Sequence, residues 1–419
     1  MKKHRKKTLE NITHPGHPHR ILIARSLCLI GFFIVSCTTP LPTETAPSPV
    51  ITTPVAAPSP LGTPDSAPSH TFPNCSPAIF PYRTIDALPY FINPNFESRQ
   101  PTLANLAKKH DIRIGTAVSA NLLKDEAYAV LLSNEFNMVT PEVDMKWENI
   151  HPEPDRFDFT KGDTIVAFAQ IHQMALYGHV LVWDLQLPAW VTQGQFTRDQ
   201  WIDLLCTHIK SVVGHYRGKI YAWDVVNEAL DESGKLRNTI WLQNIGPEYI
   251  AMAFHWAHEA DPSALLVYND FMAEGMNQKS QAVYALVQGL LRQNVPIDAV
   301  GLQMHVGLNS PPTFHALSEN MQRLSELGLS VYITEMDVKL QYSTRNTSEK
   351  LSAQSRVYRH AIAACINAPN CRGFSTWGLT DRYSWIPDYT GNEDAPLLFD
   401  VEGQPKPAYF AIIDLLQTP

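Results

Sequence analysis

Short apolar runs recur along the chain from about residue 100 onward, and longer amphipathic segments separate them. Runs that are rich in β-branched and aromatic residues favour buried strands, whereas apolar residues at every third or fourth position favour helices. The clearest amphipathic segments cover residues 198–216, 249–260 and 279–292. The predicted strands cover residues 112–118, 138–143, 176–183, 220–228, 265–271, 299–305, 331–338 and 373–379.

Strands that alternate with helices in this way predict an α/β fold with a parallel sheet. Eight such units without an internal sequence repeat predict a (β/α)8 TIM barrel over residues 100–419. A linker precedes it over residues 38–74, where ten prolines with Thr, Ser and Ala predict an extended spacer that buries no core. Residues 75–99 form a short lead-in to the barrel.

The first 37 residues have the pattern of an export signal. A basic start with seven Lys and Arg residues leads into an apolar stretch over residues 27–35, which is too short to span a bilayer as a helix. The stretch closes on Ile34-Val-Ser-Cys37, which resembles the lipobox of bacterial lipoproteins, where the cysteine is lipidated. An ordinary signal peptide with a chance cysteine is the alternative. We expect a mature chain outside the cytoplasm, held at the cell surface by a lipid on Cys37 or otherwise secreted.

Charge is distributed unevenly along the chain. Residues 1–37 carry a net charge of +6, and the remainder, with 26 Lys and Arg against 40 Asp and Glu, carries −14. An acidic body argues against nucleic acid as a partner and is compatible with a neutral polysaccharide.

Two of the predicted strands lead into a glutamate. Residues 220–228 end in Asn227-Glu228, and the run Val331-Tyr-Ile-Thr334 is followed by Glu335. Barrel enzymes place catalytic groups at the carboxyl ends of strands, and a glycosidase needs two carboxyl groups. Taken singly, each glutamate is equally well explained as a solvated strand-end residue, so the flanking motifs decide.

Polar and aromatic motifs also end most of the other strands. They are Pro141-Glu-Val-Asp-Met-Lys-Trp147, Gly178-His179 with Trp183-Asp-Leu-Gln186, Tyr268-Asn-Asp270, Gln303-Met-His305, Thr334-Glu-Met-Asp337 and Trp377-Gly-Leu-Thr-Asp-Arg-Tyr-Ser-Trp385. In this order and spacing they closely resemble glycoside hydrolase family 10, the endo-β-1,4-xylanases, over residues 100–417. The resemblance implies a retaining endo-xylanase that acts on xylan, as a monomer and without a metal or organic cofactor. A related barrel β-glucanase and a catalytically inactive xylan-binding lipoprotein are the alternatives.

The resemblance also implies roles for individual residues. Glu228 matches the acid/base, Glu335 the nucleophile, and Asn227 the residue that hydrogen-bonds the 2-hydroxyl of the sugar. His305 with Asp337 matches the group that supports the nucleophile. Positions that line the glycone subsites are matched by Glu142, Lys146, His179, Trp183, Gln186, Gln303, Trp377 and Trp385.

Two positions depart from the family pattern. Val143 stands where the family usually has Asn, which removes an amide that binds a distal sugar. Asp184 stands where the family usually has His, which adds a carboxylate near Glu228. Such a carboxylate either repels the ionised acid/base or pairs with a cation such as Lys146.

Four cysteines lie beyond the export signal, and their spacing fits no zinc site. Cys365 and Cys371 bracket a short loop, so we expect a disulfide between them in an oxidising compartment. Cys206 lies in an amphipathic helix and is expected to be a buried free thiol.

Overall fold

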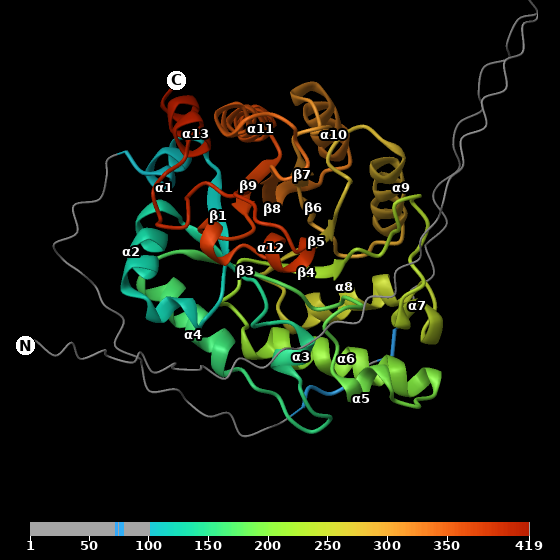
Figure 1. Ribbon diagram of the computed structural model, residues 1–419. Coiled ribbons are helices and arrows are strands. Elements are labelled where there is room, and N and C mark those ends of the chain that lie inside the picture. The colour runs from blue at the N-terminus through green and yellow to red at the C-terminus, as the bar shows by residue number, and fades with distance from the viewer. Residues whose placement is uncertain (1–71, 74, 79–100, 419) are drawn as a thin grey trace, which may run out of the picture. The chain divides into compact units, whose positions relative to one another are not determined.

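The computed structural model describes residues 72–73, 75–78 and 101–418 of the chain (Figure 1). The expected export signal with Cys37 lies outside the described residues, as do most of the linker and of the lead-in.

Eight parallel strands close into a barrel, which confirms the predicted fold. The ring closes because β1 pairs with β9 and β6 pairs with β8, and the short β7 continues the line of β6 beyond Met304. The strands are β1 (Arg113–Val118), β2 (Met138–Pro141), β3 (Ala175–Gly178), β4 (Ala222–Asn227), β5 (Leu265–Asp270), β6 (Ala299–Leu302), β7 (His305–Gly307), β8 (Ser330–Lys339) and β9 (Cys371–Thr376).

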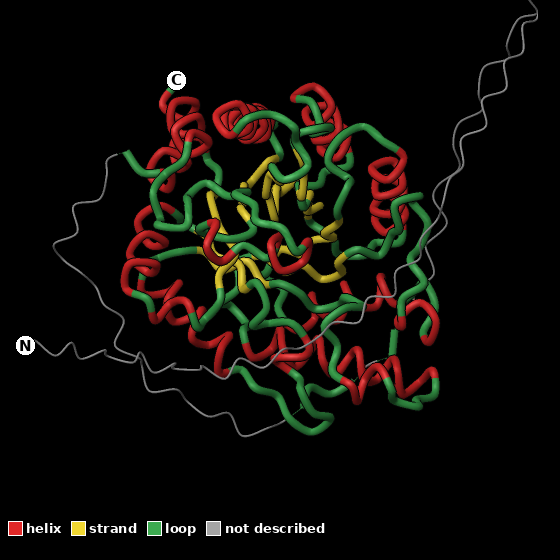
Figure 2. The backbone as a smooth tube through the Cα atoms, viewed as in Figure 1, coloured by secondary structure: helices red, strands yellow, loops and turns green. Residues whose placement is uncertain are grey.

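Helices surround the strands on all sides (Figure 2). Local sequence specifies where the longest ones begin, because Thr197, Asn277 and Asn346 each form a capping box with the residue three positions later. No helix within the described part of the chain is long and apolar enough to cross a membrane. The α-helices are α1 (Leu103–Ala107), α2 (Glu126–Glu135), α3 (Trp147–Ile150), α4 (Thr160–Ile171), α5 (Ala189–Thr192), α6 (Arg198–His215), α7 (Ile240–Asn244), α8 (Tyr249–Ala260), α9 (Gln278–Arg292), α10 (Phe314–Glu326), α11 (Thr347–Asn367), α12 (Ile386–Thr390) and α13 (Pro407–Gln417). Short 3₁₀ turns cover Lys108–His110, Leu122–Lys124 and Asp381–Tyr383.

The barrel interior is apolar at one end and polar at the other. A buried cluster fills the end where the strands begin, and it consists of Met138, Tyr177, Ala222, Val267, Ala299 and Tyr332. Each of these residues is among the first three of its strand. The carboxyl ends of the strands are therefore free to carry polar side chains.

The short segment before the barrel is attached to its helices. Cys75 forms a disulfide with Cys206 of α6, so the expectation of a free thiol at Cys206 is wrong. Trp256 of α8 donates to the carbonyl of Pro73 at 3.0 Å, and the N–H of Ala78 donates to Ser211 at 2.9 Å. Pairing across 131 residues leaves no local sequence signal. A second disulfide joins Cys365 to Cys371 across the turn between α11 and β9.

Candidate active site

Glu228 and Glu335 both lie at the carboxyl ends of barrel strands. Glu228 directly follows β4, whereas Glu335 lies within β8 with only 4% of its surface exposed. The backbone of Glu228 is left-handed, with φ 56°, and its N–H donates to the carbonyl of Asn269 on β5 at 2.9 Å. This is the end of the barrel where the fold places catalytic groups.

Asn269 connects the two strand tips. Its Nδ2 donates to Oε1 of Glu335 at 2.6 Å and to Oδ1 of Asn227 at 3.0 Å, and its Oδ1 accepts from Thr334 at 2.8 Å. A Cβ at Gly301 on β6 would lie 2.2 Å from Oδ1 of Asn269. Glycine at position 301 therefore leaves the room that this amide needs to reach Glu335.

His305 holds the second oxygen of the Glu335 carboxylate. Its Nε2 lies 3.1 Å from Oε2 of Glu335, and its Nδ1 lies 2.8 Å from Oδ2 of Asp337. That oxygen of Asp337 also accepts from Nε1 of Trp385 at 2.9 Å. Burial opposes a charge on His305, but Asp337 and Glu335 together outweigh it and raise the pKa of His305 to about 10. Glu335 is therefore hydrogen-bonded to a cationic imidazolium.

Glu228 has a different set of partners. Its Oε1 accepts from Nδ2 of Asn227 at 3.2 Å and from Nε2 of Gln303 at 3.1 Å. Its Oε2 forms an ion pair with Nη1 of Arg237 at 3.0 Å, and 15% of the side chain is exposed. Glu228 is thus more accessible than Glu335 and stands beside a guanidinium.

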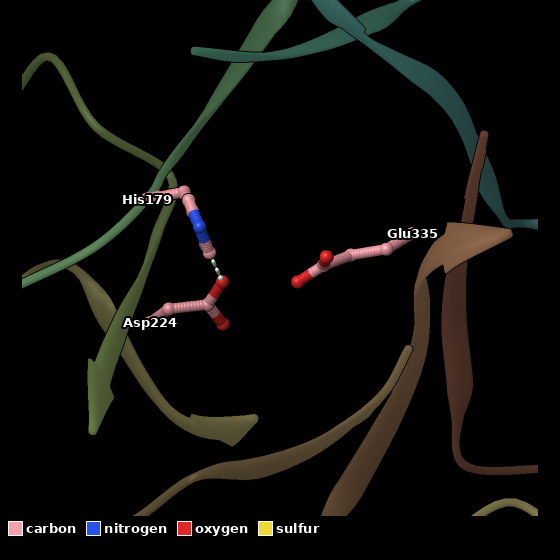
Figure 3. A group of neighbouring side chains, drawn as sticks. All are labelled: His179, Asp224 and Glu335. Atoms are coloured by element: carbon pink, nitrogen blue, oxygen red, sulfur yellow. Dashed lines mark hydrogen bonds and ion pairs between the residues drawn. The ribbon is translucent and has the colours of Figure 1, made fainter. Parts of the chain in front are cut away.

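His179 and Asp224 lie opposite Glu335 inside the barrel mouth (Figure 3). Nδ1 of His179 lies 2.8 Å from Oδ2 of Asp224, and Tyr177 donates to the other oxygen at 2.7 Å. Burial holds the pKa of His179 well below its usual range, and burial together with Glu335 holds the pKa of Asp224 well above its own. Both pKa shifts favour the uncharged forms of His179 and Asp224.

The same three side chains offer potential metal ligands, one atom from each, within 4.8 Å of one another. A divalent ion prefers ionised carboxylates, whereas burial favours the protonated form of Asp224. The donor set fits a metal poorly, and a hydrogen-bonded network beside the nucleophile candidate explains it better.

Lys146 is the centre of a second group of predicted site residues. Its Nζ donates to Oε1 of Gln186 at 2.8 Å and lies 4.8 Å from the ring centroid of Trp183 and 5.9 Å from that of Trp377. Burial lowers the pKa of Lys146, and the nearby carboxylates, Glu335 first among them, oppose that shift. The group combines polar atoms with flat apolar surfaces, which is the chemistry that binds a sugar ring.

Glu142 and Val143 follow β2 on the same side of the barrel mouth. Burial, opposed mainly by Lys146, raises the pKa of Glu142 to about 7. Val143 is half-buried, and its carbonyl accepts from Asn149 at 3.0 Å. The residues that the sequence predicted for the active site lie in the second half of a barrel strand or in the segment that follows one.

Several functional contacts were missed by sequence reasoning. Asn269 is visible in a strand-end motif, but that motif does not predict its contact with Glu335, and none of the motifs includes Arg237. Asp184 pairs with Nη2 of Arg237 at 3.1 Å, whereas Lys146 bonds Gln186, so the suggested pairing of Asp184 with Lys146 is wrong. Asp270, in the same motif as Asn269, is buried and pairs with Lys279 at 2.7 Å.

Comparison with known proteins agrees with this geometry. The family model of glycosyl hydrolase family 10 matches residues 102–415. The chain belongs to this family. Endo-1,4-beta-xylanase B of Thermotoga neapolitana is 42% identical to this family 10 chain over 329 residues, which cover 77% of the chain and 94% of that protein. The beta-1,4-xylanase of Dictyoglomus thermophilum is 41% identical over 325 residues, which cover 75% and 90%.

Solved structures of similar proteins share the barrel of this family 10 hydrolase. Xylanase 10B from Thermotoga petrophila RKU-1, in complex with xylobiose, matches with a TM-score of 0.73 at 41% identity and covers 75% of this chain and 97% of that one. Native xylanase 10B from Thermotoga maritima matches with a TM-score of 0.73 at 42% identity, covering 75% and 98%. The resemblance inferred from the strand-end motifs is thereby confirmed.

Proposed function

We propose that this family 10 hydrolase is a retaining endo-1,4-β-xylanase in which Glu335 is the nucleophile and Glu228 is the acid/base. The observation that carries the assignment is the unequal environment of the two carboxyl groups. Glu335 is buried and accepts hydrogen bonds from Asn269 and from the cationic His305. Such donors favour the ionised form that a nucleophile needs. Glu228 is more exposed, as suits a group that exchanges a proton with the leaving group and with water.

The reaction then follows two displacements. In the first, Glu335 attacks the anomeric carbon, the glycosidic bond breaks, and Glu228 gives its proton to the leaving oxygen. In the second, Glu228 takes a proton from water, the oxygen of that water attacks the anomeric carbon, and Glu335 leaves as a carboxylate. A double displacement requires about 5–5.5 Å between the two carboxyl groups, and we expect that separation between Glu228 and Glu335.

The remaining side chains orient the sugar. Oδ1 of Asn227 accepts from Asn269 and Gln303, which holds the amide in one orientation and supports its role as the partner of the 2-hydroxyl of the reacting sugar. Lys146 and Gln186 supply hydrogen-bond partners for further hydroxyls, and Trp377 and Trp385 supply flat faces for the glycone. Xylan as substrate is supported by the relatives, which are named xylanases, and by the xylobiose in one solved relative.

Product analysis on glucuronoxylan tests this function. We expect the purified enzyme to lower the viscosity of the polymer early and to release xylo-oligosaccharides of several lengths, while Glu335→Ala releases none. Binding of xylan without any release of reducing sugar would instead support the inactive xylan-binding protein. Faster release from a β-1,4-glucan than from xylan would support the β-glucanase.

We also propose that the enzyme is exported and tethered to a membrane through a lipid on Cys37. The lipobox-like sequence before Cys37 supports the anchor, and two disulfides, Cys75–Cys206 and Cys365–Cys371, are consistent with an oxidising compartment. Cys37→Ser is expected to move activity from the membrane fraction to the soluble fraction of a bacterial host. Unchanged membrane association in that variant would argue against the lipid anchor.

A further inference from the structure

Arg237 joins the proposed acid/base to the unusual carboxylate at position 184. Its Nη1 lies 3.0 Å from Oε2 of Glu228 and donates to the backbone carbonyl of Glu228 at 3.1 Å, while Nη2 lies 3.1 Å from Oδ2 of Asp184. The three side chains are largely enclosed, with 23% of Arg237, 17% of Asp184 and 15% of Glu228 exposed. Pairs that are this enclosed are screened less by solvent than surface pairs.

We call the contact of Arg237 with both Glu228 and Asp184 the bridge. Hydrogen bonds hold the segments that carry Arg237 and Asp184 in place. The N–H of Arg237 donates to the carbonyl of Ala229 at 2.8 Å, and Leu230 pairs with Leu236, so the chain after β4 folds back and returns Arg237 to Glu228. On the other side, Nε1 of Trp241 in α7 donates to the carbonyl of Trp183 at 2.8 Å, which fixes the position of Asp184. The guanidinium therefore spans two anchored segments.

A guanidinium beside an acid/base has two opposing effects on catalysis. It orients the carboxyl group, but its positive charge favours the ionised form and works against a group that must donate a proton. A second carboxylate on the same guanidinium offsets that charge. We propose that Arg237 is a positioning residue for Glu228 and that Asp184 restrains and neutralises it, so that Glu228 is held in place yet keeps its proton.

This inference rests on the proposed function of Glu228. The charged and titratable groups that face Glu228 come from several elements, and each of them contributes to its proton affinity. Besides Arg237 and Asp184 they are Lys146 before α3, Asp270 on β5, Glu335 on β8, and Asp231 and Glu232, which with Phe271 line the surface hollow next to Glu228.

The hollow beside Glu228 indicates which part of the substrate the bridge affects. Its lining includes Glu228, Arg237 and Phe271 but none of the Lys146 group. Because the acid/base donates its proton to the leaving oxygen, the leaving part of the sugar chain lies on the side of Glu228. The bridge therefore acts on departure of the leaving group and not on binding of the glycone.

A pH–rate study of single and double variants tests the bridge. We expect Asp184→Asn to shift the alkaline limb of kcat/KM on a xylo-oligosaccharide to lower pH by about 0.5–1 unit, because Arg237 then acts on Glu228 alone. In an Arg237→Gln background the same Asp184 change should shift the limb by less than half as much. Equal shifts in the two backgrounds, or an unmoved or raised limb in Asp184→Asn, would overturn the proposal.

Two further measurements separate positioning from a merely structural role. Arg237→Gln should lower kcat/KM about tenfold or more on xylo-oligosaccharides but little on an aryl xylobioside with a good leaving group, which needs no proton. Arg198→Gln, which breaks the surface pair with Glu248, is the matched control and should change neither value. If Arg237→Gln does not fold, Arg237→Met, which also lacks the charge, takes its place in both measurements. A wild-type enzyme without activity on xylo-oligosaccharides would count against the proposed function, whereas an active wild type with an unmoved limb in Asp184→Asn counts only against the bridge.

Discussion

Nε2 of His305 lies 3.1 Å from Oε2 of Glu335 at the carboxyl end of the barrel. The strand register explains the contact: His305 on β7 stands opposite Asp337 on β8, two positions beyond Glu335. Asp337 binds the other ring nitrogen and raises the pKa of His305 together with Glu335, so the imidazole carries a positive charge at neutral pH. Glu335 is therefore held by a cation on one oxygen and by Asn269 on the other.

Replacing His305 tests the importance of that cation. We expect His305→Asn to lower kcat on xylo-oligosaccharides by about 10²–10³-fold, the usual cost of losing one preorganised donor to a reacting group. The protein should remain folded by circular dichroism. His258→Asn, a change at an exposed position of α8, is the control and should be silent. A loss of less than about threefold in His305→Asn would mean that His305 does not support the nucleophile.

Replacing Glu335 and replacing Glu228 should impair catalysis in different ways. Glu335→Ala is expected to lower turnover on every substrate on the order of 10⁴-fold or more, because no glycosyl-enzyme can form. Glu228→Ala should be least harmful for the first step on aryl glycosides whose leaving group needs no proton. Pre-steady-state measurements with an aryl xylobioside separate that step from hydrolysis of the intermediate. The opposite pattern would exchange the two roles.

A buried histidine pair outside the site predicts acid sensitivity. Nδ1 of His151 lies 3.2 Å from Nδ1 of His208, and the ring of His208 stacks on Trp147 with centroids 3.6 Å apart. Burial lowers the pKa of His151 to about 4 and that of His208 well below its usual range. The unfolded chain therefore binds protons at a higher pH than the folded one, so stability is fully present above pH ~6.5 and falls as the pH drops toward 4.

Denaturant unfolding between pH 4.5 and 7.5 measures this effect. His151 alone should contribute a loss of about 3 kcal/mol over its whole titration range, and His208 should add to it. His208→Gln is expected to be less stable at neutral pH but to show a shallower dependence on pH. His258→Gln should keep the wild-type slope. A wild-type stability that is constant from pH 7.5 to 4.5 would contradict the prediction.

The disulfide between Cys75 and Cys206 should stabilise the fold more than the one between Cys365 and Cys371. The first closes a span of 131 residues and the second a span of 6, and the loss of unfolded-state entropy grows with the length of the loop. We expect the double change Cys75→Ala with Cys206→Ala to lower the free energy of unfolding by about 3–5 kcal/mol. The matched double change at Cys365 and Cys371 should lower it by about 2 kcal/mol. Equal effects would show that strain or packing, and not loop closure, dominates.

The sequence predicted features that depend on local or repeated patterns. It did not predict contacts between residues that are far apart in the chain. The eight strands were predictable because each is a continuous apolar run, and Glu228 and Glu335 were predictable because they follow such runs. The run over 299–305 predicts one strand, but Met304, with φ 67°, interrupts it and separates β6 from β7. Similarly, the run over 176–183 ends as a strand at Gly178.

The missed features have a common physical cause. Arg237 and Asp184 are 53 positions apart, and Cys75 and Cys206 are 131 apart, so each pair becomes visible only when the barrel closes. Asn269 looked like an ordinary polar strand end, because its role depends on the space that Gly301 leaves beside it. The sequence shows which polar residues end the strands, but it does not show which residues they contact.

The stereochemistry of hydrolysis tests the assignment of Glu335 as nucleophile most directly. Proton NMR of a xylo-oligosaccharide digest, recorded within minutes of adding a large amount of enzyme, resolves the two anomers of the new reducing end before they interconvert. Attack by Glu335 followed by attack by water predicts that the β-anomer appears first and that the α-anomer grows in later by mutarotation. If the α-anomer is formed first, the enzyme inverts, and Glu335 cannot be the nucleophile of a double displacement.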